Sequence, residues 1–95
     1  MKLRWTQRAT ADLKRIAAPI AADNALAAGE FVMTIGARVE RLAQFAFLGR
    51  PGALDDTREL VVHRNYVLTY RLRRDEAQVL QIWHVARNRP RGKRA

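Results

Sequence analysis

The chain has 95 residues, of which 48% are hydrophobic and 28% charged, and its formal net charge is +9 at pH 7. This length suits one folded domain, and the absence of an apolar run of about 18 residues predicts no transmembrane helix. The absence of cysteine excludes disulfides and thiolate metal sites, and two histidines alone argue against structural zinc. The first residues contain no apolar segment typical of a secretory signal, so we expect a cytoplasmic protein with no metal, no cofactor and no membrane contact.

The positive charge is concentrated in the C-terminal half. Residues 49–95 contain eleven basic and five acidic residues, and 15 of the 18 basic residues in the chain are arginine. Because guanidinium groups are planar donors suited to phosphate and carboxylate, the composition predicts a nucleic acid or an acidic protein segment as partner. An arginine-rich surface that is merely solvated is the alternative. Residues 88–95 have nothing apolar to bury, so we expect one domain over 1–87 and a flexible basic tail after it.

The N-terminal half begins with a predicted strand and helix. Residues 2–6 alternate between basic and apolar side chains, which is typical of a short strand. From Gln7 to Ile20 apolar residues recur every three or four positions, which predicts a helix. We expect Thr6 to cap this helix and Pro19 to loosen its last turn, because proline cannot donate a helical hydrogen bond.

A second amphipathic helix is predicted over about 25–45, after a break at Asp23–Asn24 in which Asn24 acts as the cap. Its apolar stripe consists of Phe31, Ile35, Val39, Leu42 and Phe45. The short link between the two helices predicts an antiparallel helical hairpin.

Three strands are predicted in the C-terminal half, after a stop at Gly49–Gly52 and a polar loop. They cover Arg58–His63, Tyr66–Arg73 and Val79–Val85, and short turns join them into an antiparallel meander. The order strand, helix, helix, strand, strand, strand predicts a two-layer α+β domain. In it the helical hairpin covers one face of a mainly antiparallel sheet.

Four segments, in this order and at this length, resemble the RelE/ParE superfamily of toxins from bacterial type II toxin–antitoxin modules. The segments are Trp5–Thr6 with Ala9, Asp12–Leu13 and Ile16; Leu42–Phe45 with Leu48–Gly52; Thr57–Val62 with Tyr66–Arg71; and Val79–Arg87. The resemblance implies that the free protein is toxic and that a small antitoxin neutralises it. It also implies one of two activities: RelE-like members are ribosome-dependent ribonucleases that cut mRNA, and ParE-like members poison DNA gyrase without being nucleases.

The positions that would serve RNA cleavage are partly empty. Cleavage through the 2′-OH needs a base for its proton, a cation for the phosphorane and an acid for the leaving oxygen. Val67 stands where the resemblance to RelE-like members implies an arginine. No lysine lies between Lys14 and Lys93, and no tyrosine follows Tyr70. We therefore favour a ParE-like toxin that binds gyrase and is not an enzyme. A RelE-like endoribonuclease and a non-toxic nucleic-acid-binding module stay open as alternatives.

The candidate residues for binding the target or the antitoxin are Arg58, Arg71, His84, Arg87 and Arg89. In the ribonuclease alternative, Arg58, His84 and Arg87 would carry the chemistry, since imidazole exchanges protons near neutral pH and arginine binds phosphate. A structural hydrogen bond of His84 and an ion pair between Arg58 and Glu59 are the competing interpretations. Both branches of the superfamily carry His-x-x-Arg at this place, so His84 does not separate them.

Leu13, Ile16 and Ile20 on the first helix predict an apolar groove for a helix or extended arm of the antitoxin. We expect the antitoxin to present an acidic, partly disordered segment that complements the positive charge. The other expected partner is DNA gyrase, or the ribosome in the ribonuclease alternative, and we expect DNA to be met only indirectly through the antitoxin.

Overall fold

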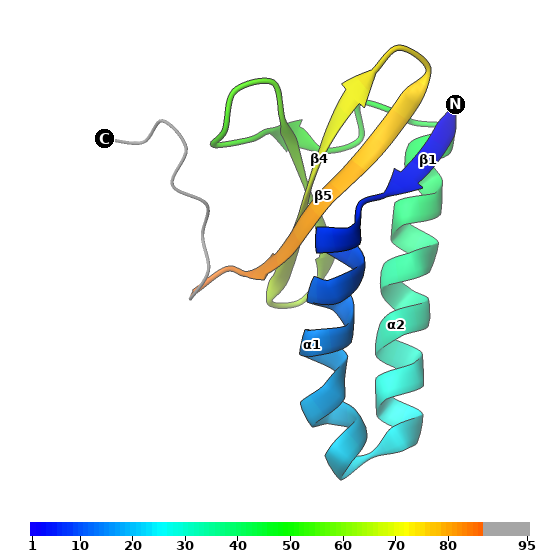
Figure 1. The fold of residues 1–95 in the computed structure, drawn as a ribbon, viewed down its shortest axis with the longest axis vertical. Helices are drawn as coiled ribbons and strands as arrows, with labels where there is room; N and C mark the ends of the chain where they lie inside the picture. Colours follow the sequence, from blue (N-terminus) through cyan, green and yellow to red (C-terminus); the bar gives the residue numbers. More distant parts are fainter. Residues whose placement is uncertain (87–95) are drawn as a thin grey trace.

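In the computed structural model, which describes residues 1–86, two helices pack on one face of a five-stranded sheet (Figure 1). The elements are β1 (Lys2–Trp5), α1 (Gln7–Asp23), α2 (Ala25–Glu40), a 3₁₀ turn (Arg41–Ala43), β2 (Arg50–Pro51), β3 (Arg58–His63), β4 (Tyr66–Arg73) and β5 (Glu76–His84). The strand order is β1-β5-β4-β3-β2, with β1 parallel to β5 and the other neighbours antiparallel. The predicted two-layer α+β class is confirmed, and the expected tail over 88–95 lies outside the described residues.

Two short-range features shape α1. The Thr6 hydroxyl accepts a hydrogen bond from the Ala9 amide at 3.2 Å and donates to the Val79 carbonyl at 2.8 Å. The predicted cap is confirmed, and it also ties the start of α1 to β5. The helix continues through Pro19 to Asp23, so the proline removes one helical hydrogen bond without ending the helix.

Asn24 separates the helices as predicted, since its side-chain oxygen accepts a hydrogen bond from the Ala27 amide at 3.0 Å and so caps α2. The predicted end of α2 near residue 45 is wrong. The helix ends at Glu40, where the chain tightens into the 3₁₀ turn and leaves the path of the helix. The turn buries Leu42, whereas Phe45, expected on the buried stripe, is 51% exposed.

The strands β3 and β4 have the predicted bounds, and two other strand predictions need correction. β5 begins at Glu76 rather than Val79, because its first residues pair with β1 on one side and with the end of β4 on the other. It ends at His84. The short strand β2 was not predicted; it forms where Arg50 pairs with Glu59 of β3.

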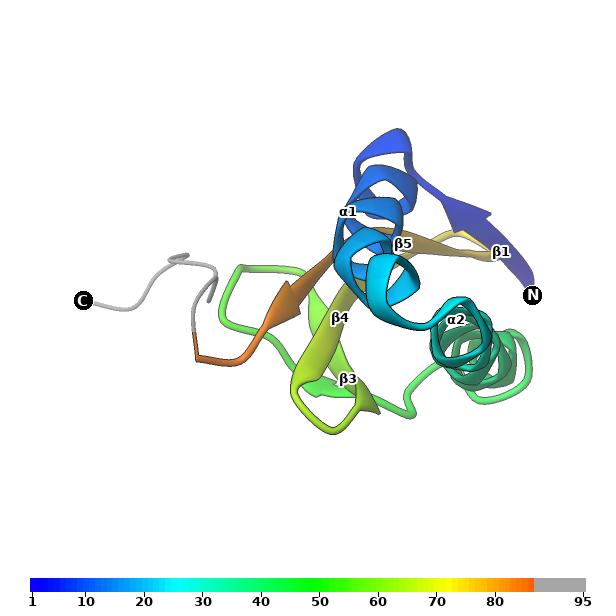
Figure 2. The same ribbon diagram turned by 90° about the horizontal axis from the view of Figure 1, so that it is seen from below.

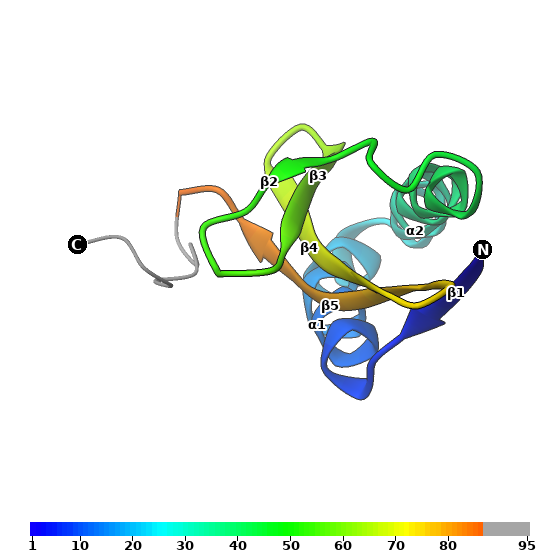
Figure 3. The same ribbon diagram turned by 90° about the horizontal axis from the view of Figure 1, so that it is seen from above.

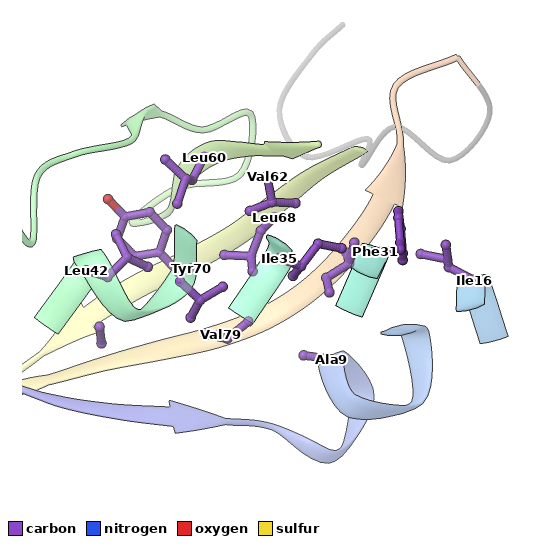
Figure 4. Packing of buried hydrophobic residues seen from close by; sticks show 13 residues of the cluster. Ala9, Ile16, Phe31, Ile35, Leu42, Leu60, Val62, Leu68, Tyr70 and Val79 are labelled. Carbon is purple, nitrogen blue, oxygen red and sulfur yellow. The ribbon is translucent and has the colours of Figure 1, made fainter. Parts of the chain in front are cut away.

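The core lies between the hairpin and the sheet (Figure 4). Its fully buried side chains include Ile35, Leu42, Val62, Leu68, Tyr70 and Val79. The Tyr70 hydroxyl donates to the Ala46 carbonyl at 2.8 Å and accepts from the Gly49 amide at 2.9 Å. Tyr70 therefore fastens the loop between α2 and β2 to the centre of the sheet.

The two helices cover different parts of the same face of the sheet, as the view along the helical hairpin shows (Figure 2). α1 packs on β5, and α2 packs on β3 nearer the other edge. Neither helix among residues 1–86 is long and apolar enough to cross a membrane.

The two edges of the sheet are covered to different extents. β1 pairs only with the first part of β5, and further along the Asp12 carboxylate of α1 accepts a hydrogen bond from the Ile82 amide at 3.0 Å. The Asp12 side chain thus satisfies one amide of β5 that has no strand partner on that side among residues 1–86. At the opposite edge, β2 pairs only with Arg58 and Glu59 of β3. Residues 60–63 therefore have no neighbouring strand on that side within the described part of the chain.

Candidate functional site

Arg58 is held by the loop that precedes β2. Its Nε and Nη2 donate to the Gly49 carbonyl at 3.0 and 2.6 Å, and its guanidinium lies 5.1 Å from the centroid of the Phe47 ring. The ion pair with Glu59 considered for Arg58 is instead made by Arg50, at 3.4 Å. Arg58 therefore fastens this loop to β3.

His84 belongs to an aromatic cluster at the end of the sheet near the start of α2. The Tyr66 ring packs edge-on against His84 at 5.2 Å and against Phe31 at 5.5 Å, and His63 packs on Phe31 at 4.8 Å. The Nδ1 of His84 accepts a hydrogen bond from the Ala86 amide at 3.1 Å, which leaves the proton of a neutral ring on Nε2. His84 therefore makes a structural hydrogen bond, which was the alternative to a catalytic role.

Arg58 and His84 do not lie together. Arg58 is opposite Tyr70 on β4 and His84 is opposite Tyr66, which places them four residues apart along that strand. At the rise of an extended strand this is about 13 Å. As placed, the two side chains do not converge on one phosphate.

Of the remaining candidates the structure describes only Arg71, and it is not brought to either residue. Arg71 projects from the other face of the sheet than Tyr70, because side chains alternate along β4, and its Nε donates to Oε1 of Gln78 at 2.9 Å. Arg87 and Arg89 lie outside the described residues.

The outer face of the sheet is the face turned away from the helices. Its centre contains three buried side chains, Val67, Thr69 and Trp83. These residues are 1%, 1% and 2% exposed. Val67 and Trp83 are direct neighbours across β4 and β5, and the indole Nε1 donates to Oγ1 of Thr69 at 2.9 Å. These three buried side chains therefore supply no acid, base or cation. Among residues 1–86, no group of three or more His, Cys, Asp or Glu side chains is placed to hold a metal ion.

Comparison with known proteins decides the family. The family model described as "ParE toxin of type II toxin-antitoxin system, parDE" matches residues 3–89. This chain belongs to the ParE toxin family. A relative from Sinorhizobium fredii, named "Putative toxin Y4kP", is 39% identical over 90 residues, which are 94% of this chain and 93% of the relative. The solved "Chromosomal ParDE TA system from P. aeruginosa" superposes with a TM-score of 0.82 at 31% identity, over 90% of this chain and 96% of that chain.

Membership confirms the resemblance inferred from the sequence, including the preference for the ParE-like branch. The matching solved structure also agrees with the order of strands and helices described above. The chain is therefore a ParE-type toxin of a type II toxin–antitoxin system.

The three residues of the predicted apolar groove, Leu13, Ile16 and Ile20, are buried to different extents in this ParE toxin. Ile16 is a core residue that is only 8% exposed, whereas Leu13 and Ile20 pack at the margin of the core. Ile20 also lines a cavity of about 350 Å³ together with Phe31 and His63. Of the three predicted groove residues, only Ile20 lines this cavity, which we call the Ile20 cavity.

A further cavity, of about 370 Å³, lies between α2 and β3 and was not predicted. Its lining residues are Ala37, Arg38, Arg41, Leu48 and Leu60. Nη1 of Arg38 donates to the Val61 carbonyl at 3.4 Å, and the Arg41 guanidinium lies 5.6 Å from the Phe45 ring centroid. Neither arginine forms an ion pair with another residue of 1–86. The sequence carries one signal, the apolar residues at 45–48, of which the predicted second helix includes only Phe45.

Exposed apolar side chains adjoin this α2–β3 cavity. Leu48, which lines it, is 41% exposed. Val61 follows the lining residue Leu60 along β3, but its side chain projects from the outer face opposite Val67, and it is 48% exposed. Phe47 is 72% exposed. Apolar side chains beside an unpaired strand edge suit an extended peptide, which would add main-chain hydrogen bonds and bury its own side chains in the cavity.

Proposed function

We propose that this ParE toxin inhibits DNA gyrase by binding to it and does not cleave nucleic acid. The observation that supports this most strongly is the centre of the outer face, where Val67, Thr69 and Trp83 stand in place of proton-transfer and phosphate-binding groups. RNA cleavage needs those groups within reach of one phosphate. Arg58 is fixed on the Gly49 carbonyl, at a distance from His84, and cannot supply them with it.

Purified toxin is expected to inhibit supercoiling of relaxed plasmid by gyrase at near-equimolar amounts, and prior mixing with the antitoxin should restore the reaction. Full supercoiling at a large molar excess of folded toxin would contradict the proposal. Primer extension on translated mRNA provides the complementary measurement. Cuts positioned by codon would support the RelE-like ribonuclease instead, and we expect none.

We also propose that the antitoxin neutralises the toxin by laying an extended segment along residues 60–63 of β3, with apolar side chains in the α2–β3 cavity. On the side away from β4, residues 60–63 have no neighbouring strand within residues 1–86, and the long bond from Arg38 to the Val61 carbonyl would give way to main-chain hydrogen bonds of the segment. Leu48 and Val61 offer apolar contact. Arg38 and Arg41 offer cations to an acidic segment, which fits the net charge of +9. The Ile20 cavity offers the same partner a second apolar contact.

Reversing both charges, Arg38→Glu with Arg41→Glu, is expected to weaken antitoxin binding by about a hundredfold, because two attractive contacts become repulsive. The measurement is isothermal titration with the protein encoded by the reading frame that adjoins the toxin gene. Lys14→Glu with Arg64→Glu is the matched control, since both of its positions are exposed and neither lines the cavity. Equal losses in the two double variants would point to net charge alone and contradict this placement of the antitoxin.

A further inference from the structure

A basic surface lies at the end of the sheet farthest from the tip of the helical hairpin. The turn between β4 and β5 and the start of β1 meet there (Figure 1), and β1, β5 and β4 lie side by side (Figure 3). Together they form a shallow cavity of about 440 Å³. Its basic lining residues are Lys2, Arg71, Arg73 and Arg74. We call them the hairpin-end basic surface, after the β-hairpin formed by β4 and β5.

Basic side chains outnumber the carboxylates on this surface, and only some of them are paired with a carboxylate. Lys2 and Arg74 are exposed, and neither forms an ion pair with any residue of 1–86. The hydrogen bond that Arg71 donates goes to the neutral amide of Gln78, so its charge is retained. Arg73 pairs with Asp56 at 3.0 Å, but both side chains are more than half exposed, so water screens the pair.

Two carboxylates share the cavity, and they do not cancel the basic residues. Asp75 and Glu76 line it together with the four basic residues of the hairpin-end basic surface. The Glu76 carboxylate approaches Arg4 of β1, a fifth basic side chain at this end, at 4.0 Å. Basic groups therefore remain in excess over acidic ones, and an anion would find cationic donors on β1, on β4 and in the turn between β4 and β5.

Strand register spreads these cations across the sheet. Lys2 is opposite Glu76, which is opposite Arg73, and in the next row Arg4 and Arg71 flank Gln78. Neighbouring strands are about 4.8 Å apart, so the cations of a row on β1 and β4 are separated by about 10 Å. Cations at that spacing can each contact a different charge of an extended polyanion, whereas they are too far apart to bind one small anion together.

We propose that the hairpin-end basic surface binds the phosphate backbone of duplex DNA, so that the toxin contacts the DNA held by gyrase as well as gyrase itself. This inference rests on the proposed function, and it replaces the expectation that DNA is met only through the antitoxin. None of the residues lining the cavity is apolar, and an interface with protein would carry apolar anchors at its centre. Interfaces with DNA are polar and strongly basic. The α2–β3 cavity, by contrast, combines arginines with the apolar residues Leu48 and Leu60.

The test measures the binding of the full-length toxin to a fluorescein-labelled duplex of mixed sequence, by anisotropy between 50 and 200 mM salt. The test variant is Lys2→Gln with Arg74→Gln, which removes two exposed side chains without ion-pair partners in the described chain. Each phosphate contact contributes about 0.9 to the slope of log affinity against log salt. We therefore expect the slope to fall by about 2 and the affinity at 100 mM salt to fall about tenfold or more.

The matched control is Lys14→Gln with Arg64→Gln, which removes one lysine and one arginine from α1 and from the β3–β4 turn at the other end of the sheet. We expect the control to change the slope by much less than the test variant. Equal effects in the two variants, or no effect in either, would overturn the proposal. So would a test variant that binds DNA normally but loses binding to polyglutamate, because that result assigns the surface to an acidic protein.

The same proteins separate this inference from the proposed function. Gyrase subunits without DNA measure protein binding alone, and we expect wild-type toxin and the Lys2/Arg74 variant to bind them equally. Loss of gyrase binding by wild-type toxin with intact DNA binding would contradict the gyrase proposal and leave the DNA surface standing. The opposite result would contradict the DNA surface alone.

Discussion

Replacing Gly49 by alanine is expected to lower the free energy of unfolding by about 3–5 kcal/mol. A Cβ atom at this position would lie 2.5 Å from the Glu59 carbonyl oxygen and 2.8 Å from Cε1 of Tyr70. Neither neighbour can move aside easily, because the carbonyl belongs to β3 and Tyr70 is fully buried. The loop itself would have to move, which would break the bonds from Gly49 to the Tyr70 hydroxyl and from Arg58 to the Gly49 carbonyl.

Urea unfolding followed by circular dichroism measures the loss, and thermal unfolding should show a midpoint lower by about 12 °C or more. Gly36→Ala is the matched control, since a Cβ there meets nothing within 4 Å. In the middle of α2 it should raise stability by up to about 1 kcal/mol. The two substitutions are chemically identical, so shifts in the same direction would show that the close contact at Gly49 does not govern stability.

Local features of the fold followed from the sequence because short-range rules determine them. Alternation gave the bounds of β3 and β4, and the caps at Thr6 and Asn24 depend only on residues three positions away. The end of α2 and the strand β2 did not follow. Both depend on Tyr70 and Arg58, which hold the intervening loop from a distant part of the chain.

The candidate site was predictable as a list of residues but not as an arrangement. The sequence singled out Arg58 and His84, and only the pairing of β4 with β3 and β5 shows that they are four residues apart along the sheet. The α2–β3 cavity escaped prediction because it exists only where two elements pack together. The sequence indicated one part of the outer face, because Val67 stands where the resemblance to RelE-like nucleases implies an arginine. The packing of Val67 against Trp83 depends on strand register and could not be predicted.

The structural role of Asp12 was not predicted from the sequence. The sequence does contain a signal for it, because this carboxylate lies between the apolar positions Ala9 and Leu13 of an amphipathic helix. It is 4% exposed, and its Oδ2 accepts the hydrogen bond from the Ile82 amide at 3.0 Å. Its Oδ1 accepts from Arg15 at 2.8 Å. The residue therefore joins α1 to the part of β5 that β1 does not reach, with arginine providing charge balance at the surface.

Asp12→Ala is accordingly expected to lower the free energy of unfolding by about 3 kcal/mol, because it leaves the buried Ile82 amide without an acceptor and removes a charge-assisted hydrogen bond. Asp12→Asn keeps an oxygen for that amide and loses only the attraction to exposed arginines, so its cost should be about 1 kcal/mol. Hydrogen exchange at the Ile82 amide provides an independent measurement, and it should accelerate strongly in the alanine variant and little in the asparagine variant. If both variants were destabilised equally, the ion pair with Arg15 would be the main contribution. Arg15→Ala, which leaves the Ile82 bond intact, would then have to show the same loss.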